Sequence, residues 1–463
     1  MSSAVGLLAL LGATACFNPE MSPLDSDDGE GSTSAASPDT SAIDTDGTPE
    51  PGVDTDQPSA DGADGNTDGP EPGDTDDGPA PECEGHADCD AGAFCIEGAC
   101  GPCSDADAPD QLCADDDPLA PLCGAEGQCV ACVADSCSGD TPVCDPGLGC
   151  AACTEHSDCP DSACHLLGPE QGSCFDPGDV VDASTADELE TALSELGIGS
   201  QRVIRLASGV YEINGTLQVA GEVAVIGQPG TVITGGATNL FVLTSEDTQR
   251  ILYLSEVALD DGPFRAIQCR HGNLLWMDDI TINGYSTSID TDCDTYARRS
   301  RFTAAEPESV AIRIIGDGMF QATNSSIGPG SDTAVSIESG ELRLYHSTIA
   351  GNHNTVSCDG SSGGGEIRNS IIVGAYPGSF SSWCSLTFAD NAVDGGLGAG
   401  QSVGIFDSDW FVDAPAGDFH LSAEGQSVFA DIADWDEGDP LFDVDGDPRP
   451  QEAPGYPGID EVP

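Results

Sequence analysis

Between residues 203 and 373 the chain alternates short apolar runs with glycine and asparagine. The phrases ILYLSEVALDDG, GNLLWMDDITINGY and GELRLYHSTIAGN align with one another on a single apolar position. That position forms an apolar ladder, spaced by 23, 45, 22 and 23 residues: Leu259, Ile282, Ile327, Ile349 and Ile372. A polar ladder lies three residues before it: Glu256, Asp279, Asn324, His346 and Asn369. Because 45 residues are two steps, both ladders repeat about every 22 residues.

Two ladders with one period predict a solenoid in which each repeat forms one coil. Strands this short, with no helix between them, are typical of a parallel β-helix, whose coils stack at the spacing of neighbouring strands. A β-sandwich of hairpins is the alternative, but it does not require like residues to recur at a fixed step. The sequence therefore predicts an all-β fold, with a parallel β-helix of about eleven coils over residues 184–440.

The stretch STADELETALSEL, residues 184–196, predicts one short amphipathic helix. Thr185 and Glu188 are placed for a capping box, and the apolar face is formed by Leu189, Ala192, Leu193 and Leu196. Together with VIRLASGVYEINGTLQVAGEVAVIGQPG, which follows, this stretch resembles the start of right-handed, pectin-lyase-like β-helices. The resemblance implies that the helix caps the N-terminal end of the solenoid core.

The polar ladder is interpreted as architectural, because stacked polar side chains at solenoid turns satisfy backbone groups and each other. His346 is accordingly expected to be a turn residue. The segment SIDTDCDTYARRSRFTAAEPE, residues 288–308, interrupts the pattern between two regular coils. It is predicted to be a protruding loop, and such loops on solenoids often form binding surfaces.

The pectin-lyase-like resemblance also implies where catalysis would occur. Lyases of that family use a calcium-binding cluster of acids on the outer face of one sheet, with an Arg or Lys as base. Arg270, Arg313 and Asp359 are the candidate catalytic residues, because their neighbours are expected to point inward. No compact set of three acids accompanies either arginine, and the motif set of the family's hydrolases is incomplete. Catalysis is therefore the less favoured hypothesis.

The chain has 21 cysteines, and sixteen of them form four units of four, joined by C-x2-C junctions. An even count per unit permits two internal disulfides in each, and this density is typical of an oxidising compartment. Zinc bound by the C-x2-C pairs is the alternative. The histidines of this region, His86, His156 and His165, are expected to be solvated. The predicted disulfide cysteines, within a repeat region over residues 83–175, are Cys83, Cys89, Cys95, Cys100, Cys103, Cys113, Cys123, Cys129, Cys132, Cys137, Cys144, Cys150, Cys153, Cys159, Cys164 and Cys174.

Charge narrows the range of partners. The chain has 82 acidic residues and 12 basic ones, so its formal net charge is -70. Such a protein repels nucleic acid and anionic membrane surfaces. Residues 16–82 are rich in Asp, Gly, Pro and Thr and contain no Lys or Arg, which predicts a disordered acidic linker.

The first fifteen residues contain the apolar stretch VGLLALLGATA, which is typical of a signal peptide and too short to span a bilayer. The sequence ATAC resembles the lipobox of bacterial lipoproteins, which implies cleavage before Cys16 and acylation of that cysteine. Phe17, rather than Asp, after the cysteine implies sorting to the outer membrane or cell surface. Ordinary cleavage near Ala15 is the alternative.

The C-terminal tail, residues 441–463, contains the phrase FDVDGDPRP and resembles the closing segment of bacterial secreted β-helix proteins. Asp443, Asp445 and Asp447 are candidate calcium ligands, because carboxylate oxygens are the ligands that calcium prefers. A hydrogen-bonded turn is the alternative. Calcium is the one candidate cofactor.

These features predict a cell-surface lipoprotein whose β-helix binds carbohydrate or a surface protein without catalysis. The lipid anchor would be its only contact with a membrane. The alternative functions are a surface-displayed polysaccharide lyase or glycoside hydrolase, and a passive structural spacer or coat protein.

Overall fold

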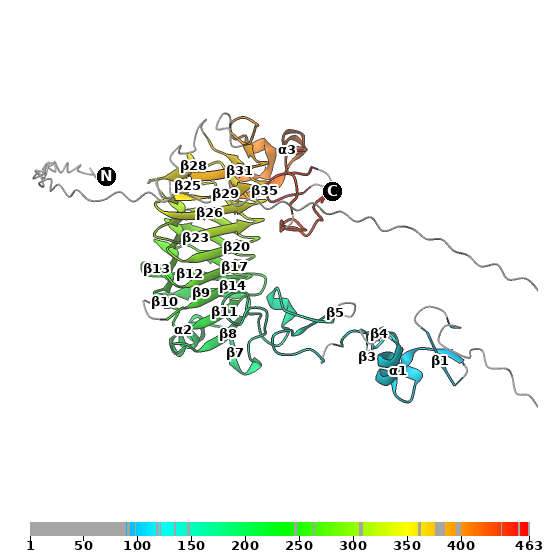
Figure 1. Cartoon of the computed structure of the whole chain (residues 1–463). Coiled ribbons are helices and arrows are strands. Elements are labelled where there is room, and N and C mark those ends of the chain that lie inside the picture. The colour runs from blue at the N-terminus through cyan, green and yellow to red at the C-terminus, as the bar shows by residue number, and fades with distance from the viewer. Residues whose placement is uncertain are drawn as a thin grey trace, which may run out of the picture. The chain divides into compact units, whose positions relative to one another are not determined.

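A computed structural model gives the structure of the chain (Figure 1). It describes residue 89 and residues 93–461, except for these gaps: 98, 117–119, 121, 134–135, 146–148, 245–247, 263, 305–308, 360–362, 376–384, 395–399, 437 and 452–453. The predicted signal peptide, Cys16, the acidic linker and Cys83 lie outside the described residues.

The cysteine-rich region consists of small modules that share one layout. In each module the third and fourth cysteines lie directly opposite each other on antiparallel backbone segments. The second module also contains helix α1, Pro109–Asp116. The segments are β1 (Phe94–Ile96) with β2 (Ala99–Gly101), β3 (Leu122–Cys123) with β4 (Cys129–Val130), β5 (Val143–Asp145) with β6 (Gly149–Ala151), and an isolated bridge between Cys164 and Cys174.

The disulfides within the modules are interlaced. The second cysteine of each module bonds the fourth, and in the last three modules the first bonds the third. The bonds are Cys89–Cys100, Cys103–Cys123, Cys113–Cys129, Cys132–Cys144, Cys137–Cys150, Cys153–Cys164 and Cys159–Cys174. Cys95 is also disulfide-bonded. The predicted disulfide modules are confirmed for the described cysteines.

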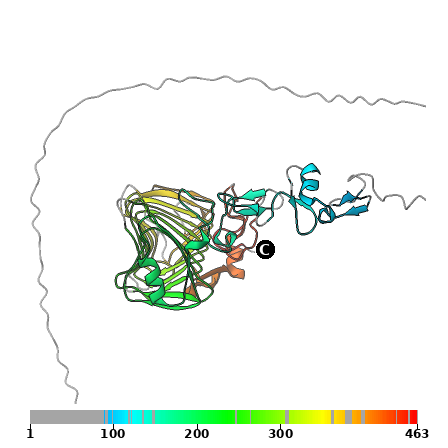
Figure 2. The ribbon, with the colours of Figure 1, turned by 90° about the horizontal axis from the view of Figure 1, so that it is seen from below.

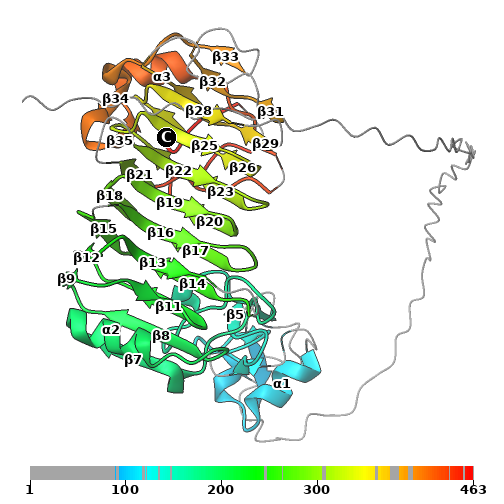
Figure 3. The ribbon, with the colours of Figure 1, turned by 90° about the vertical axis from the view of Figure 1, so that its left-hand side faces the viewer.

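Residues 180–402 form a parallel β-solenoid of about eight turns, built from three sheets (Figures 1 and 3). Sheet 1 contains β7 (Val180–Ala183), β8 (Gln201–Leu206), β11 (Glu222–Ile226), β14 (Ile251–Ser255), β17 (Leu274–Asp278), β20 (Asp294–Arg298), β23 (Met319–Thr323), β26 (Gly340–Tyr345), β29 (Gly363–Arg368) and β31 (Ser385–Ala389). Sheet 2 contains β9 (Gly209–Ile213), β12 (Thr231–Gly235), β15 (Ala258–Asp260), β18 (Thr281–Tyr285), β21 (Arg301–Ala304), β24 (Ser326–Ile327), β27 (Thr348–Ala350), β30 (Ile371–Val373), β32 (Ala392–Val393) and β33 (Gln401–Ser402). Sheet 3 contains β10 (Leu217–Gln218), β13 (Asn239–Leu243), β16 (Arg265–Cys269), β19 (Thr287–Thr291), β22 (Val310–Ile314), β25 (Thr333–Ile337) and β28 (Asn354–Cys358).

The apolar ladder predicted from the sequence is a stack of register partners in sheet 2. Leu259 pairs with Ile282, and the stack continues through Ile327, Ile349 and Ile372. All five side chains are buried in one continuous apolar cluster that runs the length of the solenoid. Figure 2 looks along this stack of coils. The parallel β-solenoid prediction is confirmed.

The predicted protruding loop is wrong for residues 288–304, while residues 305–308 lie outside the described residues. Residues 287–304 form a regular coil with one strand in each sheet, and Phe302 fills the missing position of the apolar ladder. The coil looks polar in sequence because Thr291 and Thr295 are buried and their hydroxyls hydrogen-bond each other at 2.8 Å. A disulfide, Cys269–Cys293, ties this coil to the preceding one.

Helix α2, Ala186–Ser194, begins where the sequence predicted it. Thr185 Oγ1 accepts a hydrogen bond from the Glu188 amide at 3.3 Å, and the Glu188 carboxylate accepts from the Ser184 amide at 2.7 Å. The predicted apolar face is buried in the solenoid cluster, which it caps beside β7 and β8 (Figure 3): Leu189, Ala192, Leu193 and Leu196. No helix of the described residues is long and apolar enough to cross a membrane.

The last strand of the solenoid is β33, and the chain then leaves the stack of coils. A hairpin of β34 (Phe411–Asp413) and β35 (Asp418–Leu421) and helix α3 (Ala423–Phe429) form a second apolar cluster against sheet 2. Residues 431–461 follow as an irregular strap. The solenoid therefore has about eight turns instead of about eleven, because this C-terminal region packs on its side instead of extending it.

Candidate functional site

The candidate catalytic residue Arg270 follows β16, at the edge of the outer face of sheet 3. Its Nη2 donates a 2.9 Å hydrogen bond to Asp290 Oδ2, and Arg265 Nε lies 2.9 Å from the same oxygen. Asp290 is fully buried. Arg270 is thus occupied in a charge cluster that ties neighbouring coils together.

Arg313, two coils further along, is also ion-paired. Its Nε donates to Glu338 Oε1 at 2.7 Å, and this hydrogen bond outweighs partial burial and raises the pKa of Arg313. A lyase base must release its proton during turnover, so a raised pKa opposes that role. Asp359 follows β28 in the same column as Arg270, and its amide donates to Ile337 O at 3.0 Å. The structure therefore places the three candidates on one sheet edge but does not gather them around one point.

The candidate calcium ligands also do not converge. Asp443 is buried, and its Oδ1 accepts from the amides of Asp445 and Asp447 at 2.9 and 2.8 Å. Its Oδ2 accepts from the Glu461 amide at 2.9 Å. These hydrogen bonds describe the turn that was the alternative to a calcium site.

A different set of possible metal ligands gathers nearby. Asp445 Oδ2 lies 2.9 Å from His420 Nε2, and ligand atoms of His420, Asp445 and Asp460 lie within 4.8 Å of one another. His420 and Asp418 also pair, through Nδ1, at 2.5 Å. Asp418, Asp445 and Asp460 outweigh the effect of burial and raise the pKa of His420. The carboxylates thus stabilise the imidazolium form of this histidine.

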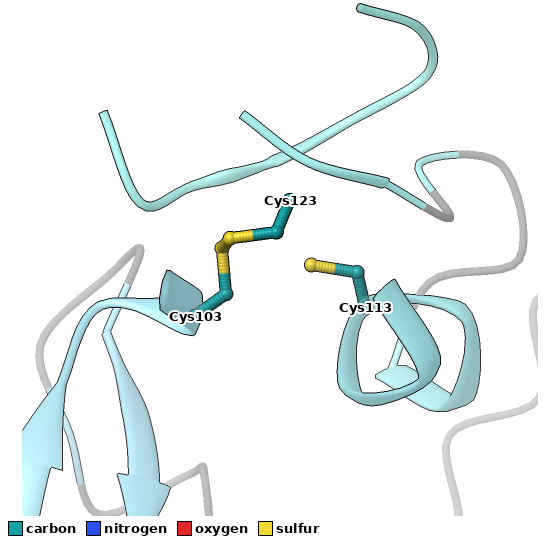
Figure 4. Close-up of side chains that lie close together, drawn as sticks. All are labelled: Cys103, Cys113 and Cys123. Atoms are coloured by element: carbon teal, nitrogen blue, oxygen red, sulfur yellow. A yellow bond between two sulfur atoms is a disulfide. The ribbon is translucent and has the colours of Figure 1, made fainter. Parts of the chain in front are cut away.

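Three cysteine clusters have sulfurs close enough to bind a metal, and Figure 4 shows one of them, Cys103, Cys113 and Cys123. All nine cysteines of these clusters are in disulfides. A sulfur in a disulfide is not a thiolate, so it is not available as a zinc ligand.

The polar ladder consists of turn residues between sheets 1 and 2 in the left-handed conformation. Their φ angles, and those of Arg299 and Asp390 at the equivalent turns of other coils, lie between 46° and 55°. In the second half of the solenoid the ladder binds the C-terminal strap. Asn324 Nδ2 donates to Phe442 O at 2.7 Å, and Asn369 Nδ2 donates to Asp434 O at 2.7 Å.

His346 lies at the centre of this contact and is 2 % exposed. Its Nε2 is 3.1 Å from Asn369 Nδ2 and 3.4 Å from Asp439 Oδ2. Burial, only partly opposed by Asp439, lowers the pKa of His346 to about 4. The ring is therefore neutral at neutral pH and serves as a turn residue and strap contact.

The sequence reasoning missed an aromatic–arginine band on the outer face of sheet 1, formed by Trp276, Tyr296, Arg298, Arg343, Tyr345 and Arg368. Trp276 and Tyr296 are register partners with ring centroids 6.0 Å apart. The Arg298 guanidinium lies 5.9 Å from the Trp276 ring, and that of Arg368 lies 5.3 Å from the Tyr345 ring. All six side chains are partly exposed.

A buried carboxylate anchors one end of the band. Asp278 accepts hydrogen bonds at 3.1 and 3.0 Å from the Nε atoms of Arg298 and Arg299, and further bonds from their Nη2 atoms. Burial would raise the pKa of Asp278, but these bonds outweigh it and lower the pKa. The two guanidinium groups are thus fixed in position beside the rings.

At the other end of the band, Arg368 is held by the C-terminal strap. Its Nη1 donates to Asp436 at 2.9 Å and its Nη2 donates to Asp439 at 2.5 Å. Between the two ends, Arg343 pairs with Glu341 on its own strand, at 2.9 and 3.0 Å. The sequence contained a signal for the band, because Trp276 and Tyr296 recur at one strand position. The polar sequence of the coil that carries Tyr296 and Arg298 predicts a loop instead, so the signal is hidden.

The fourth cysteine module packs on sheet 1 next to the band. In this contact the rings of Phe175 and Tyr253 lie edge to face, with their centroids 6.0 Å apart. Tyr253 Oη also donates a hydrogen bond to Leu167 O at 2.9 Å. His165 is 1 % exposed, stacks on Phe175 at 3.7 Å and lies 2.7 Å from Glu222. The expectation that His156 and His165 are solvated is therefore wrong, because the module's loops form an interface.

Comparisons with known proteins assign no activity. A family model described as a family of unknown function, DUF8331, matches residues 70–181. ORF18 of Geobacillus virus E2 is similar in structure to 49% of this chain, with 11% identity and a TM-score of 0.29. The match covers 63% of that viral chain, less than two thirds of its length, and a TM-score this low does not establish a shared fold. No curated protein matches the chain.

Proposed function

We propose that this protein is an exported surface lipoprotein whose β-solenoid binds carbohydrate without cleaving it. The observation that supports binding is the aromatic–arginine band on sheet 1. Flat aromatic faces stack on the apolar faces of sugar rings, and guanidinium groups donate hydrogen bonds to hydroxyl and acidic groups. Successive strands lie about 4.8 Å apart, so the band spreads its rings and guanidinium groups over several stacked coils, along which an extended polymer could lie.

The proposal of binding without cleavage rests on the ion pairs of the candidate catalytic residues. Arg270 shares Asp290 with Arg265, and Arg313 is paired with Glu338. We further propose that the solenoid is of the pectin-lyase-like type. Its three parallel sheets, its N-terminal capping helix and its left-handed turn residues support this assignment.

Lipidation at Cys16 is proposed from the lipobox-like sequence ATAC alone. The acidic stretch that follows supports an extended tether, because like charges repel along a chain.

The test of carbohydrate binding uses the chain that begins at Phe17, with a panel of neutral and acidic polysaccharides. Binding and newly formed reducing or unsaturated ends are both measured. We expect binding without new ends, and we expect Trp276→Ala to weaken binding about two- to tenfold.

The matched control is Phe264→Ala, which removes an exposed aromatic ring that pairs with an arginine on sheet 3 instead of sheet 1. It should leave binding unchanged. New chain ends that disappear in Arg270→Gln or Arg313→Gln would identify a lyase or hydrolase instead. No binding by the folded protein to any member of the panel would favour a spacer.

A further inference from the structure

A cavity of about 240 Å³ lies beside the band, between the fourth cysteine module and sheet 1. This volume corresponds to about eight water molecules in the liquid, which is enough space for one sugar residue. The module contributes residues 155–162, and the solenoid contributes strand ends and left-handed turn residues. The cavity is lined by Glu155, His156, Ser157, Cys159, Pro160, Ser162, Arg205, Ile226, Ser255, Glu256, Asp278 and Arg299.

His156 lines this cavity and carries a buried hydrogen-bond donor that has no partner among the described residues. Its Nδ1 accepts from the Cys164 amide at 3.2 Å, so in the neutral ring the proton is on Nε2. The ring is neutral at neutral pH, because burial lowers the pKa of His156 to about 4. Nε2 is buried and makes no hydrogen bond to any described residue. A buried donor of this kind is unfavourable until an acceptor satisfies it.

Two guanidinium groups add positive charge. Arg299 uses Nε and Nη2 to bind Asp278, and Arg205 uses Nη2 to bind Pro160 O at 2.9 Å. Their other N–H groups are not engaged in these bonds. Asp278 binds Arg298 as well as Arg299. One carboxylate therefore neutralises only one of these two guanidinium charges.

The remaining carboxylates lie at the rim. Glu155 has 44 % of its side chain exposed, and Glu256 is exposed as well. The inner part of the cavity therefore presents donors and positive charge, while the rim presents acceptors. This distribution matches a sugar residue whose acidic group points inward and whose hydroxyl groups face the rim.

We propose that this cavity binds one acidic sugar residue of the carbohydrate, through a carboxylate or sulfate group that contacts His156, Arg205 and Arg299. The inference rests on the proposed carbohydrate binding and adds the class of ligand: a polymer with an acidic residue next to the segment that covers the band.

The test compares two probes on the folded chain that begins at Phe17: a neutral glucose oligosaccharide, and the same oligosaccharide ending in glucuronic acid. Titration calorimetry measures both affinities, and a sulfated analogue distinguishes sulfate from carboxylate. We expect the acidic probe to bind about tenfold more tightly, a difference that charge-assisted hydrogen bonds supply. Arg299→Asn should abolish the preference, since asparagine accepts the same left-handed conformation at other turns.

His156→Phe is a second variant, which keeps a ring against Tyr253 and removes the Nε2 donor. It should reduce the preference for the acidic probe without affecting the neutral one. Phe264→Ala changes an exposed ring on sheet 3 and should leave both affinities unchanged. Equal affinities of the wild type for the two probes would overturn this inference and leave the proposed function intact. Binding of neither probe would overturn both.

Discussion

Single residues decide how the coils of this solenoid turn. Asparagine and aspartate tolerate positive φ better than other non-glycine residues, which explains their recurrence between sheets 1 and 2. Arg299 and His346 occupy the same conformation, and arginine, unlike histidine, is not among the residues that favour it. Both are held by contacts outside the turn, Arg299 by Asp278 and His346 by Asn369 and Asp439.

The burial of His346 predicts acid sensitivity. Its folded pKa of about 4 lies below the usual value of 6.5, so its stabilising contribution is complete above pH 6.5 and is lost as the pH falls towards 4. As the pH falls from 7 to 5, this residue should lower the free energy of unfolding by about 2 kcal/mol. We expect His346→Asn to reduce the pH dependence of the unfolding free energy by that amount, as measured by urea unfolding across this range.

His156 contributes with the same sign, so the His346→Asn variant should retain part of the acid sensitivity of the wild type. The control is His271→Asn, which changes an exposed histidine in the turn after β16. Its pH profile should match that of the wild type. An unchanged profile in His346→Asn would show that this histidine is not protonated during acid unfolding.

At the scale of elements, the modules and the solenoid are stabilised by different interactions. Among the described residues, the apolar cluster of the first two modules has only Phe94, Cys103 and Cys113 as buried members. Each interlaced disulfide contributes roughly 2–4 kcal/mol, so these bonds must provide most of the stability of the modules. The solenoid has a continuous apolar cluster and depends much less on its disulfides.

Reduction of the disulfides should therefore destabilise the modules more than the solenoid. With a phosphine reductant at neutral pH, we expect limited proteolysis to cut residues 89–174 first and to leave a resistant fragment that begins near residue 179. Mass spectrometry of the fragments makes this measurement. Without reductant, both parts should resist.

The Cys269–Cys293 disulfide requires its own control, because it lies inside the solenoid. In a variant with Cys269→Ser and Cys293→Ser, the free energy of unfolding of the solenoid should fall by about 3 kcal/mol. When this variant is digested without reductant, its modules should remain protected. Digestion of the solenoid before the modules under reducing conditions would contradict this division of stability.

At the scale of the whole molecule, the large net negative charge is consistent with the proposed export to the cell surface. A formal charge of -70 keeps copies of the chain apart and solvated. All twelve basic residues are arginines, and all lie at or beyond Arg202, in or beyond the first strands of the solenoid. Side-chain positive charge from Lys and Arg is therefore confined to the solenoid and the C-terminal region, and the aromatic–arginine band holds part of it.

The proposed lipid anchor predicts a specific mass for the mature chain. In the membrane fraction of the native host, the intact chain should begin at Cys16 and carry the added mass of acyl groups, as measured by mass spectrometry after detergent extraction. The Cys16→Ser variant should lose this mass and leave the membrane fraction. A mature chain with an unmodified Cys16, or one that begins after it, would contradict the anchor.

The sequence by itself determined the elements that depend on local pattern. The period of about 22 residues identified a parallel solenoid, because identical positions of successive coils must stack. The even count of four cysteines per unit identified the disulfide modules, and the spacing of Thr185 and leucines identified the capping helix.

Only the tertiary structure decided which polar residues meet. The coil at residues 287–304 was hidden in the sequence, because polar side chains can be buried when they bond each other. The strap on Asn324, His346 and Asn369, and the cavity beside Arg299, join residues far apart in the chain. Their register follows from packing between segments, and no local pattern encodes such contacts.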